Sequence, residues 1–220
     1  METALRNIMN NKVAKKIARP APGGPPQRFS LYAPDGSRKY LNSGERRRAL
    51  AAIAKLPPSK ALFALTLAWS GARVSEVLAL TPASFQIESG IVAIVTLKRR
   101  RFTVREVPLP PDLISALEHQ FGLLAAQRDP SAAHSPVWIW HRVTAWKLVK
   151  EVMGAAGVVG RQASPRGFRH GFGVGALQAG APLNLVQRWL GHAQISTTAI
   201  YADACGPEER AFADRFWRLG

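Results

Sequence analysis

Two β-rich runs interrupt a sequence that is otherwise patterned for helices. IVAIVTL (91–97) and TVREVPL (103–109) are rich in β-branched residues, and the basic segment KRRRF lies between them. Such runs, joined by a short charged segment, predict a hairpin with a cationic tip. Because the flanking sequence favours helices, we expect an α+β fold that is mainly α-helical, with a small antiparallel β-sheet or hairpin.

Helix caps and helix breakers predict where the helices begin and end. Ser43 is expected to cap a helix that ends near Leu56, and Ser59 to begin a second helix with apolar residues almost all round. Gly71 ends that second helix, which is predicted to lie in the core, and a short helical segment follows. Later helical patterns cover residues 111–127, 143–156, 165–179, 182–191, 195–203 and 207–218.

The first 40 residues differ in composition from the rest. Residues 20–26 are nearly all Pro, Gly and Ala, which predicts a linker, and residues 1–40 carry eight Lys or Arg against two acidic residues. We therefore expect a basic N-terminal arm with a Pro/Gly-rich linker over 1–40 and one domain over 41–220. Three lysines of the arm are candidate contacts to phosphate groups: Lys12, Lys15 and Lys16.

The charge of the chain indicates a polyanionic partner. Lys and Arg number 30 against 14 Asp and Glu, and the formal net charge of +16 favours nucleic acid over a membrane surface. No apolar run is long enough to span a membrane, and the single Cys205 excludes an internal disulfide framework or a multi-cysteine zinc site. From charge alone, the alternative is a basic protein without nucleic-acid chemistry.

Three arginines have backbone settings that suit phosphate binding. Arg73 follows a helix-ending glycine on a turn anchored by apolar residues, so its guanidinium can be aimed at a phosphate. Arg166 and Arg169 lie three residues apart in SPRGFRH and are expected to share a helix face. The alternatives are an ion pair between Arg73 and Glu76 and a solvated basic face at 166–169.

Lys98, His192 and Tyr201 are further candidates. Lys98 ends the first β-rich run, where a hairpin would lift its ammonium group off the sheet. His192 follows the helix-breaking Gly191, and Tyr201 lies near the end of ISTTAIYADAC. The alternatives are a solvated hairpin tip, a structural histidine and a core tyrosine. Three basic residues complete the predicted tip: Arg99, Arg100 and Arg101.

This set of side chains favours phosphodiester chemistry over a metal site. Mg²⁺ needs several oxygen ligands and Zn²⁺ needs thiolates or several histidines, which the candidates do not supply. Cations around a phenol suit a phosphodiester, whose non-bridging oxygens gain charge in the transition state. A phenol has a pKa of about 10, and adjacent guanidinium groups stabilise its nucleophilic anion. We therefore expect no metal and no cofactor.

Five segments follow one another in a recognisable order: GARVSEVLAL, TLKRRRFTVREVPLP, SPRGFRHGFGVGALQAG, LNLVQRWLGH and ISTTAIYADA. In order and spacing they resemble the signature boxes of the tyrosine recombinases, the phage integrase family. The resemblance runs from about Leu41 to Tyr201. It implies the recombinase catalytic fold and a site-specific recombinase that cleaves and rejoins DNA through a 3′-phosphotyrosyl intermediate.

The resemblance also implies a role for each candidate residue. Arg73 and Arg169 would clamp the scissile phosphate, and His192 would hydrogen-bond to it. Tyr201 would attack phosphorus, and Lys98 would protonate the leaving 5′-hydroxyl. Because the phosphotyrosyl ester conserves the bond energy, the reaction would need neither ATP nor a metal.

Arg166 departs from the family pattern. The family most often has a histidine at this position, whereas a guanidinium stays protonated and cannot take the proton of the tyrosine. Arg166 would then stabilise charge while water or the phosphate acts as the base. His170 is a weaker candidate for that base.

The resemblance further implies an assembly on double-stranded DNA. Family members act as homo-oligomers, namely tetramers, and full-length members carry a helical DNA clamp that a 40-residue arm is too short to form. We expect a catalytic domain with a basic arm, with an accessory protein as one source of the missing clamp. The last helix, with Phe212, Phe216 and Trp217, would dock on a neighbour or pack on its own domain.

Two other functions stay open at this level. One is a weakly active or non-catalytic DNA-binding relative that regulates or assists recombination. The other, from outside the family, is a basic structural nucleic-acid binder. For the recombinase we expect no membrane partner and a cytoplasmic, nucleoid-associated location in a prokaryotic, phage or plasmid setting.

Overall fold

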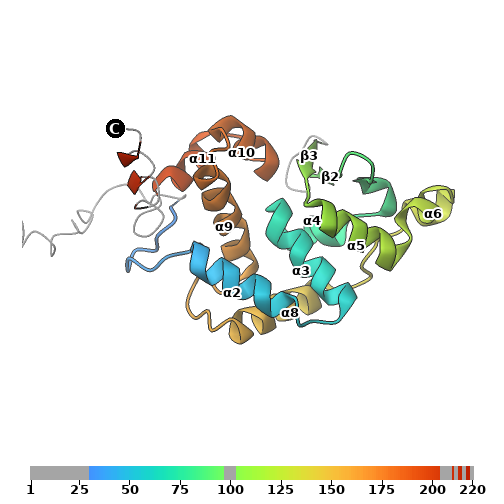
Figure 1. Ribbon diagram of the computed structural model, residues 1–220, viewed down its shortest axis with the longest axis horizontal. Helices are drawn as coiled ribbons and strands as arrows, with labels where there is room; N and C mark the ends of the chain where they lie inside the picture. Colours follow the sequence, from blue (N-terminus) through green and yellow to red (C-terminus); the bar gives the residue numbers. More distant parts are fainter. Residues whose placement is uncertain (1–29, 97–102, 204–209, 211–212, 215–216, 219–220) are drawn as a thin grey trace, which may run out of the picture. The chain divides into compact units, whose positions relative to one another are not determined.

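Helices make up most of the structure, and one small antiparallel sheet packs against them (Figure 1). The computed structural model describes residues 30–96, 103–203, 210, 213–214 and 217–218. In chain order its elements are α2 (Ser43–Ile53), α3 (Pro58–Ser70), α4 (Val74–Leu78), η2 (Pro82–Ser84), β1 (Phe85–Gln86), β2 (Ile91–Val95), β3 (Val104–Pro108), α5 (Pro111–Phe121), α6 (Leu123–Gln127), α7 (Pro130–Ala133), α8 (Arg142–Ala155), α9 (Pro165–Gln178), α10 (Leu183–Leu190), α11 (Ser196–Ala199) and η3 (Ile200–Asp203).

The sheet has the order β1-β2-β3 and is antiparallel throughout. Strands β2 and β3 pair from Ile91 opposite Pro108 to Val95 opposite Val104, which confirms the predicted hairpin. The two-residue strand β1 was not predicted, because so short a segment shows no alternation. The expected cationic tip falls within residues 97–102, which lie outside the described residues.

Caps decide the helix boundaries, and some differ from the prediction. Asn42, rather than Ser43, caps α2: its side chain accepts a hydrogen bond from the Glu45 N–H, and the Glu45 carboxylate accepts one from the Asn42 N–H. This helix ends at Ile53, short of the expected Leu56. Helix α3 ends as predicted at Gly71, whose left-handed backbone (φ 62°) suits a residue without a Cβ.

The later helices follow the predicted order. Helices α8, α9 and α10 agree with their predicted ranges to within one residue at each end. The predicted 111–127 helix is divided into α5 and α6 by Gly122 (φ 57°), and 195–203 is a single α-helical turn followed by the 3₁₀ turn η3. Among the described residues, no helix has both the length and the apolarity to cross a membrane.

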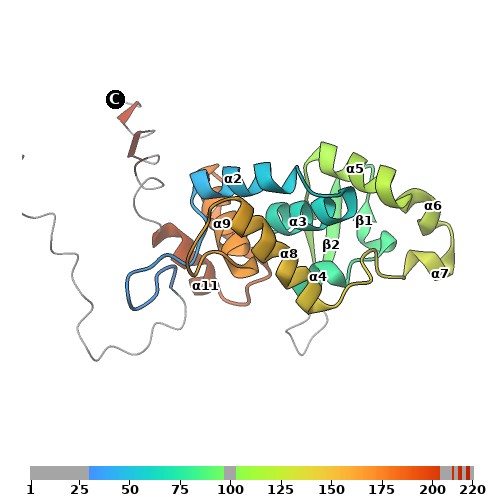
Figure 2. The ribbon, with the colours of Figure 1, turned by 90° about the horizontal axis from the view of Figure 1, so that it is seen from below.

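Two hydrophobic clusters organise these elements. The main core lies around α3 and includes Phe63, Leu67, Val77, Ile94 and Trp138. Figure 2 shows α2 and α3 beside α8 and α9; α2 and α3 contact each other, and each of them contacts both α8 and α9. A smaller group, called here the tyrosine cluster, joins α9, α10 and η3; its buried members are Leu31, Tyr40, Phe172, Val174, Val186, Leu190, Ile200 and Tyr201.

The domain starts earlier in the chain than predicted, because residues before position 41 belong to the tyrosine cluster. The compact unit begins at Leu31, ten residues before the predicted boundary at 41. Leu31 and Tyr40 are buried in the tyrosine cluster, and Tyr32 forms an isolated β-bridge with Arg38. The arm prediction was wrong for this segment because its few apolar side chains pack against a distant part of the chain, which local composition does not reveal.

Candidate active site

Arg73 is held at the start of α4 by Glu76 of the same helix. It is the N-cap residue of α4, directly after the Gly71 turn, and its backbone N–H donates to Glu76 Oε2 at 2.8 Å. Its Nη1 donates to Glu76 Oε1 at 2.7 Å, so the ion pair left open as an alternative is present. The Arg73 side chain is nevertheless 28% exposed, so part of it stays accessible to a ligand.

Arg169 is buried between the ends of two helices. Its Nη1 donates to the Gly71 carbonyl at 2.7 Å and its Nη2 to the Leu190 carbonyl at 2.6 Å. Both carbonyls lie at helix C-termini, where the helix dipole favours a cation. Burial, reinforced by the charge of Arg73, lowers the pKa of Arg169 to about 10, so it stays protonated at neutral pH.

His192 lies between α10 and α11, after the left-handed Gly191 (φ 67°). Its Nδ1 is 2.9 Å from Thr198 Oγ1, and its ring stacks on that of Tyr201 at 6.1 Å between centroids. Burial and the nearby charge of Arg169 lower the pKa of His192 to about 3. The imidazole is therefore neutral and retains one N–H donor at physiological pH.

Tyr201 is a buried residue of η3, with 2% exposure. Its ring lies against α9 at Gly173, where a Cβ would come within 2.7 Å of the tyrosine ring. Its hydroxyl is 3.1 Å from His170 Nδ1. Burial raises the pKa of Tyr201 to about 12, and the opposing charges of Arg169 and Arg73 do not offset it. Both guanidinium groups act in the expected direction, since each lowers the pKa of the phenol, but burial has the larger effect.

The comparison with known proteins assigns the chain to a family. Residues 39–205 match the model of the phage integrase family. The chain belongs to this family. It is 30% identical over 138 residues to the tyrosine recombinase XerD of Chlorobaculum tepidum, covering 60% of this chain and 44% of that protein. It is 27% identical over 172 residues to XerA of Pyrococcus furiosus, covering 74% and 56%. The chain thus spans about half the length of the curated relatives it matches.

Solved structures confirm the predicted fold. The XerA recombinase has a TM-score of 0.67 at 21% identity, covering 80% of this chain and 64% of that one. The XerH recombinase, bound to a palindromic difH substrate after cleavage, has a TM-score of 0.67 at 22% identity, covering 87% and 57%. The chain therefore has the tyrosine recombinase catalytic fold.

Arg105 shares Glu76 with Arg73 of the candidate site, although it was not among the predicted residues. It is 5% exposed on β3, and its guanidinium donates to Glu76 Oε2 (2.7 Å), to Thr96 Oγ1 (3.0 Å) and to the Trp189 carbonyl (2.7 Å). Burial opposes ionisation of Glu76, but Arg105 and Arg73 outweigh it and lower the pKa of that carboxyl. The alternation of side chains along β3 could have identified Arg105 as a buried residue, because it lies on the same inward face as Val107.

Arg166 is not joined to this cluster. It is exposed in the first turn of α9, whereas Arg169 on the next turn is buried. Within the described ranges it takes part in none of the hydrogen bonds that hold Arg73, Arg169 and Tyr201. Its charge does reach His170, whose pKa it lowers together with Arg169 and Lys39.

The remaining candidates lie outside the described residues. These are Lys98, Arg99, Arg100 and Arg101 of the hairpin tip and Lys12, Lys15 and Lys16 of the arm. The described hairpin stops at Thr96, whose hydroxyl accepts from Arg105 and whose N–H donates to the Thr103 carbonyl. In the part of the chain that is described, no three His, Cys, Asp or Glu residues are grouped to hold a metal ion.

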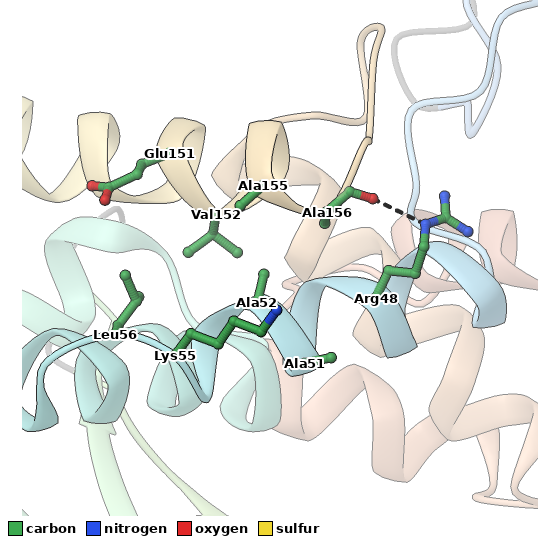
Figure 3. A pocket seen from close by; sticks show the side chains of 9 residues that line it. All are labelled: Arg48, Ala51, Ala52, Lys55, Leu56, Glu151, Val152, Ala155 and Ala156. Carbon is green, nitrogen blue, oxygen red and sulfur yellow. Dashed lines mark hydrogen bonds between the residues drawn. The ribbon is translucent and has the colours of Figure 1, made fainter.

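A separate pocket lies between α2 and α8 (Figure 3). Its volume is about 320 Å³, and its lining combines four alanines, Leu56 and Val152 with the charged residues Arg48, Lys55 and Glu151. Arg48 bridges the two helices by donating from Nε to the Ala156 carbonyl at 2.9 Å. None of the candidate catalytic residues lines this pocket.

Proposed function

We propose that this chain is the catalytic domain of a site-specific DNA recombinase, which cleaves and rejoins strands through a 3′-phosphotyrosyl intermediate. The observation that carries the proposal is the meeting of Arg73, Arg169, His192 and Tyr201, which come from four separate segments and act on one another electrostatically. The solved XerH complex with its difH substrate supports double-stranded DNA as the substrate.

The two arginines would form the phosphate clamp. Arg169 uses two of its five N–H donors on the Gly71 and Leu190 carbonyls, which aims the guanidinium and leaves three donors for a phosphate. Arg73 uses one side-chain donor on Glu76. Each fixed donor of this kind stabilises a developing oxyanion by about 3 to 4 kcal/mol, so losing either arginine should slow cleavage a hundredfold or more.

In the proposed reaction Tyr201 attacks phosphorus in line with the 5′-oxygen. The Oη–P bond forms, the P–O5′ bond breaks, and Lys98 protonates the leaving oxygen. His192, neutral and engaged at Nδ1 by Thr198, would offer its other nitrogen to a non-bridging phosphate oxygen. Because Tyr201 is 2% exposed, the side chains that cover it would have to shift when DNA enters.

The proposal extends to the rest of the assembly. A homo-tetramer would hold two duplexes, and an accessory protein is one source of further grip on DNA. The basic arm and the hairpin arginines, with Arg166, would contact phosphate groups away from the scissile one. The setting would be the cytoplasm and nucleoid of a prokaryote carrying the parent phage or plasmid.

The proposal is tested by trapping the covalent adduct. Purified chain is incubated with a random-sequence library of nicked duplexes, and adducts that resist denaturation are recovered and sequenced. The wild type and the control Tyr32→Phe should form them, and Tyr201→Phe should not. DNA binding without any adduct would instead indicate the non-catalytic relative.

A further inference from the structure

Helix α9 brings a histidine against the hydroxyl of the proposed nucleophile. His170 Nδ1 lies 3.1 Å from Tyr201 Oη, and the two rings are 5.7 Å apart between centroids. The contact depends on Gly173, one turn further along α9, because a side chain there would push the tyrosine ring away. Helix α9 thus supplies the histidine, and its glycine leaves the room that Tyr201 needs to reach that histidine.

The direction of this hydrogen bond follows from burial. A buried phenol O–H requires an acceptor, and His170 Nδ1 is the partner that the structure shows for it among the described residues. Burial, then the charges of Arg169, Arg166 and Lys39, lower the pKa of His170 to about 4, so the imidazole is neutral. A neutral imidazole that accepts at Nδ1 carries its proton on Nε2.

The charges around His170 come from two sides. Arg166 and Arg169 belong to its own helix, and Lys39 precedes α2. His192, which follows α10 and interacts electrostatically with His170, is itself neutral. These cations oppose a positive charge on His170 while the site is empty. A bound phosphate diester cancels part of that field at Arg169, which makes His170 more basic when the substrate is in place.

We propose that His170 is the general base that activates Tyr201. The inference rests on the proposed function and supplies the proton acceptor that Arg166 cannot be. As the Tyr201 Oη–P bond forms, the phenol proton passes to His170 Nδ1, while the leaving 5′-oxygen takes a separate proton from Lys98. In rejoining, the attacking 5′-hydroxyl gives up its proton to Lys98, and His170 returns its own to Tyr201.

A kinetic experiment separates this role from proton donation to the leaving group. Asn at 170 places an amide near the Nδ1 position without a titrating group, and exposed His134→Asn is the matched control. Nicked duplexes of the sequences recovered from the wild type are compared with the same duplexes carrying a 5′-bridging sulfur, whose thiolate leaves without protonation. Both variants are also checked for thermal unfolding and DNA binding.

His170→Asn should slow adduct formation at neutral pH by a hundredfold or more on both the oxygen and the sulfur duplex. Its rate should rise with pH more steeply than that of the wild type, because hydroxide replaces the missing base. Lys98→Ala should recover on the sulfur duplex. An unchanged rate for His170→Asn, recovery of this variant by sulfur, or a pH slope equal to the wild type would overturn the proposal.

A second measurement needs no DNA, so it stands even if no adduct forms and the proposed function fails. In the ¹⁵N-histidine-labelled 220-residue chain, NMR reports which ring nitrogen of His170 carries the proton. We expect the neutral Nε2–H tautomer at pH 7, and a shift of the Nδ1 signal in Tyr201→Phe. A proton on Nδ1 would contradict the proposal, because that nitrogen would then have no lone pair for the tyrosine proton.

Discussion

The main core and the tyrosine cluster bury side chains for different purposes. Around Phe63 the main core is apolar, and the ring makes edge contacts with Trp138 at 5.4 Å between centroids. The tyrosine cluster instead surrounds ionisable groups, and Arg169 is only 7% exposed beside it. The first region stabilises the fold by removing apolar surface from water. In the second region, the cost of burying charged and polar groups in fixed positions offsets part of that stability.

Truncation in the main core should have the largest effect. Phe63→Ala removes a fully buried ring and leaves a cavity, so the free energy of unfolding should fall by about 3 to 5 kcal/mol. Chemical denaturation measures this loss. At temperatures where the variant stays folded, its rate of adduct formation should match that of the wild type. A large drop in that rate would show that the main core also determines catalysis, against the division of roles between the two regions.

Arg105 contacts both regions, and its removal should lower the free energy of unfolding nearly as much as Phe63→Ala does. Arg105→Met leaves Glu76 buried with one ionic partner instead of two, which should lower the free energy of unfolding by about 3 kcal/mol. The double variant Glu76→Gln/Arg105→Met should recover part of the loss in the same denaturation assay. No recovery would mean that the arginine acts through packing rather than charge.

Arg169→Lys should affect rate more than stability. A lysine keeps the positive charge but cannot donate to the Gly71 and Leu190 carbonyls and to a phosphate in one fixed geometry. Adduct formation should slow about a hundredfold, which corresponds to about 2.7 kcal/mol. Single-turnover cleavage measures it, and a wild-type rate would show that charge alone suffices at this position.

Acidification should weaken the tyrosine cluster before the main core. The pKa of His170 is about 4 in the folded chain, below its usual 6.5, so the unfolded chain binds the extra proton first as pH falls. Stability is therefore complete above about pH 6.5 and declines toward pH 4, by about 2 kcal/mol for a partly exposed ring. Denaturation at several pH values should show a flatter profile for His170→Asn.

Arg166→Ala should have the smallest effect. The side chain is exposed, so the free energy of unfolding should change by less than about 0.5 kcal/mol. Cleavage should slow less than about tenfold, far less than for Arg169→Lys, if Arg166 contacts DNA only away from the scissile phosphate. A loss as large as that of Arg169→Lys, measured in the same cleavage assay, would place Arg166 in the clamp.

Much of the local structure could be predicted from the residues themselves. Gly71 and Gly191 end helices because the left-handed turn suits glycine, and the β-branched runs at 91–97 and 103–109 pair as a hairpin. Family membership also followed from the sequence, because the spacing of five boxes is a linear property. The predicted domain boundary was less accurate, because residues 31–40 include too few apolar side chains to indicate that this segment packs against the domain.

Only the tertiary structure decided how the charged groups meet. Neighbouring positions in SPRGFRH look alike in sequence, yet Arg166 is exposed, Arg169 is buried on two helix ends, and His170 contacts Tyr201. Burial also raises the pKa of Tyr201, although the nearby cations Arg169 and Arg73 act to lower it. Patterns in a sequence report forces that act over a few residues. Burial and pairing depend on segments far apart along the chain, and folding alone brings those segments into contact.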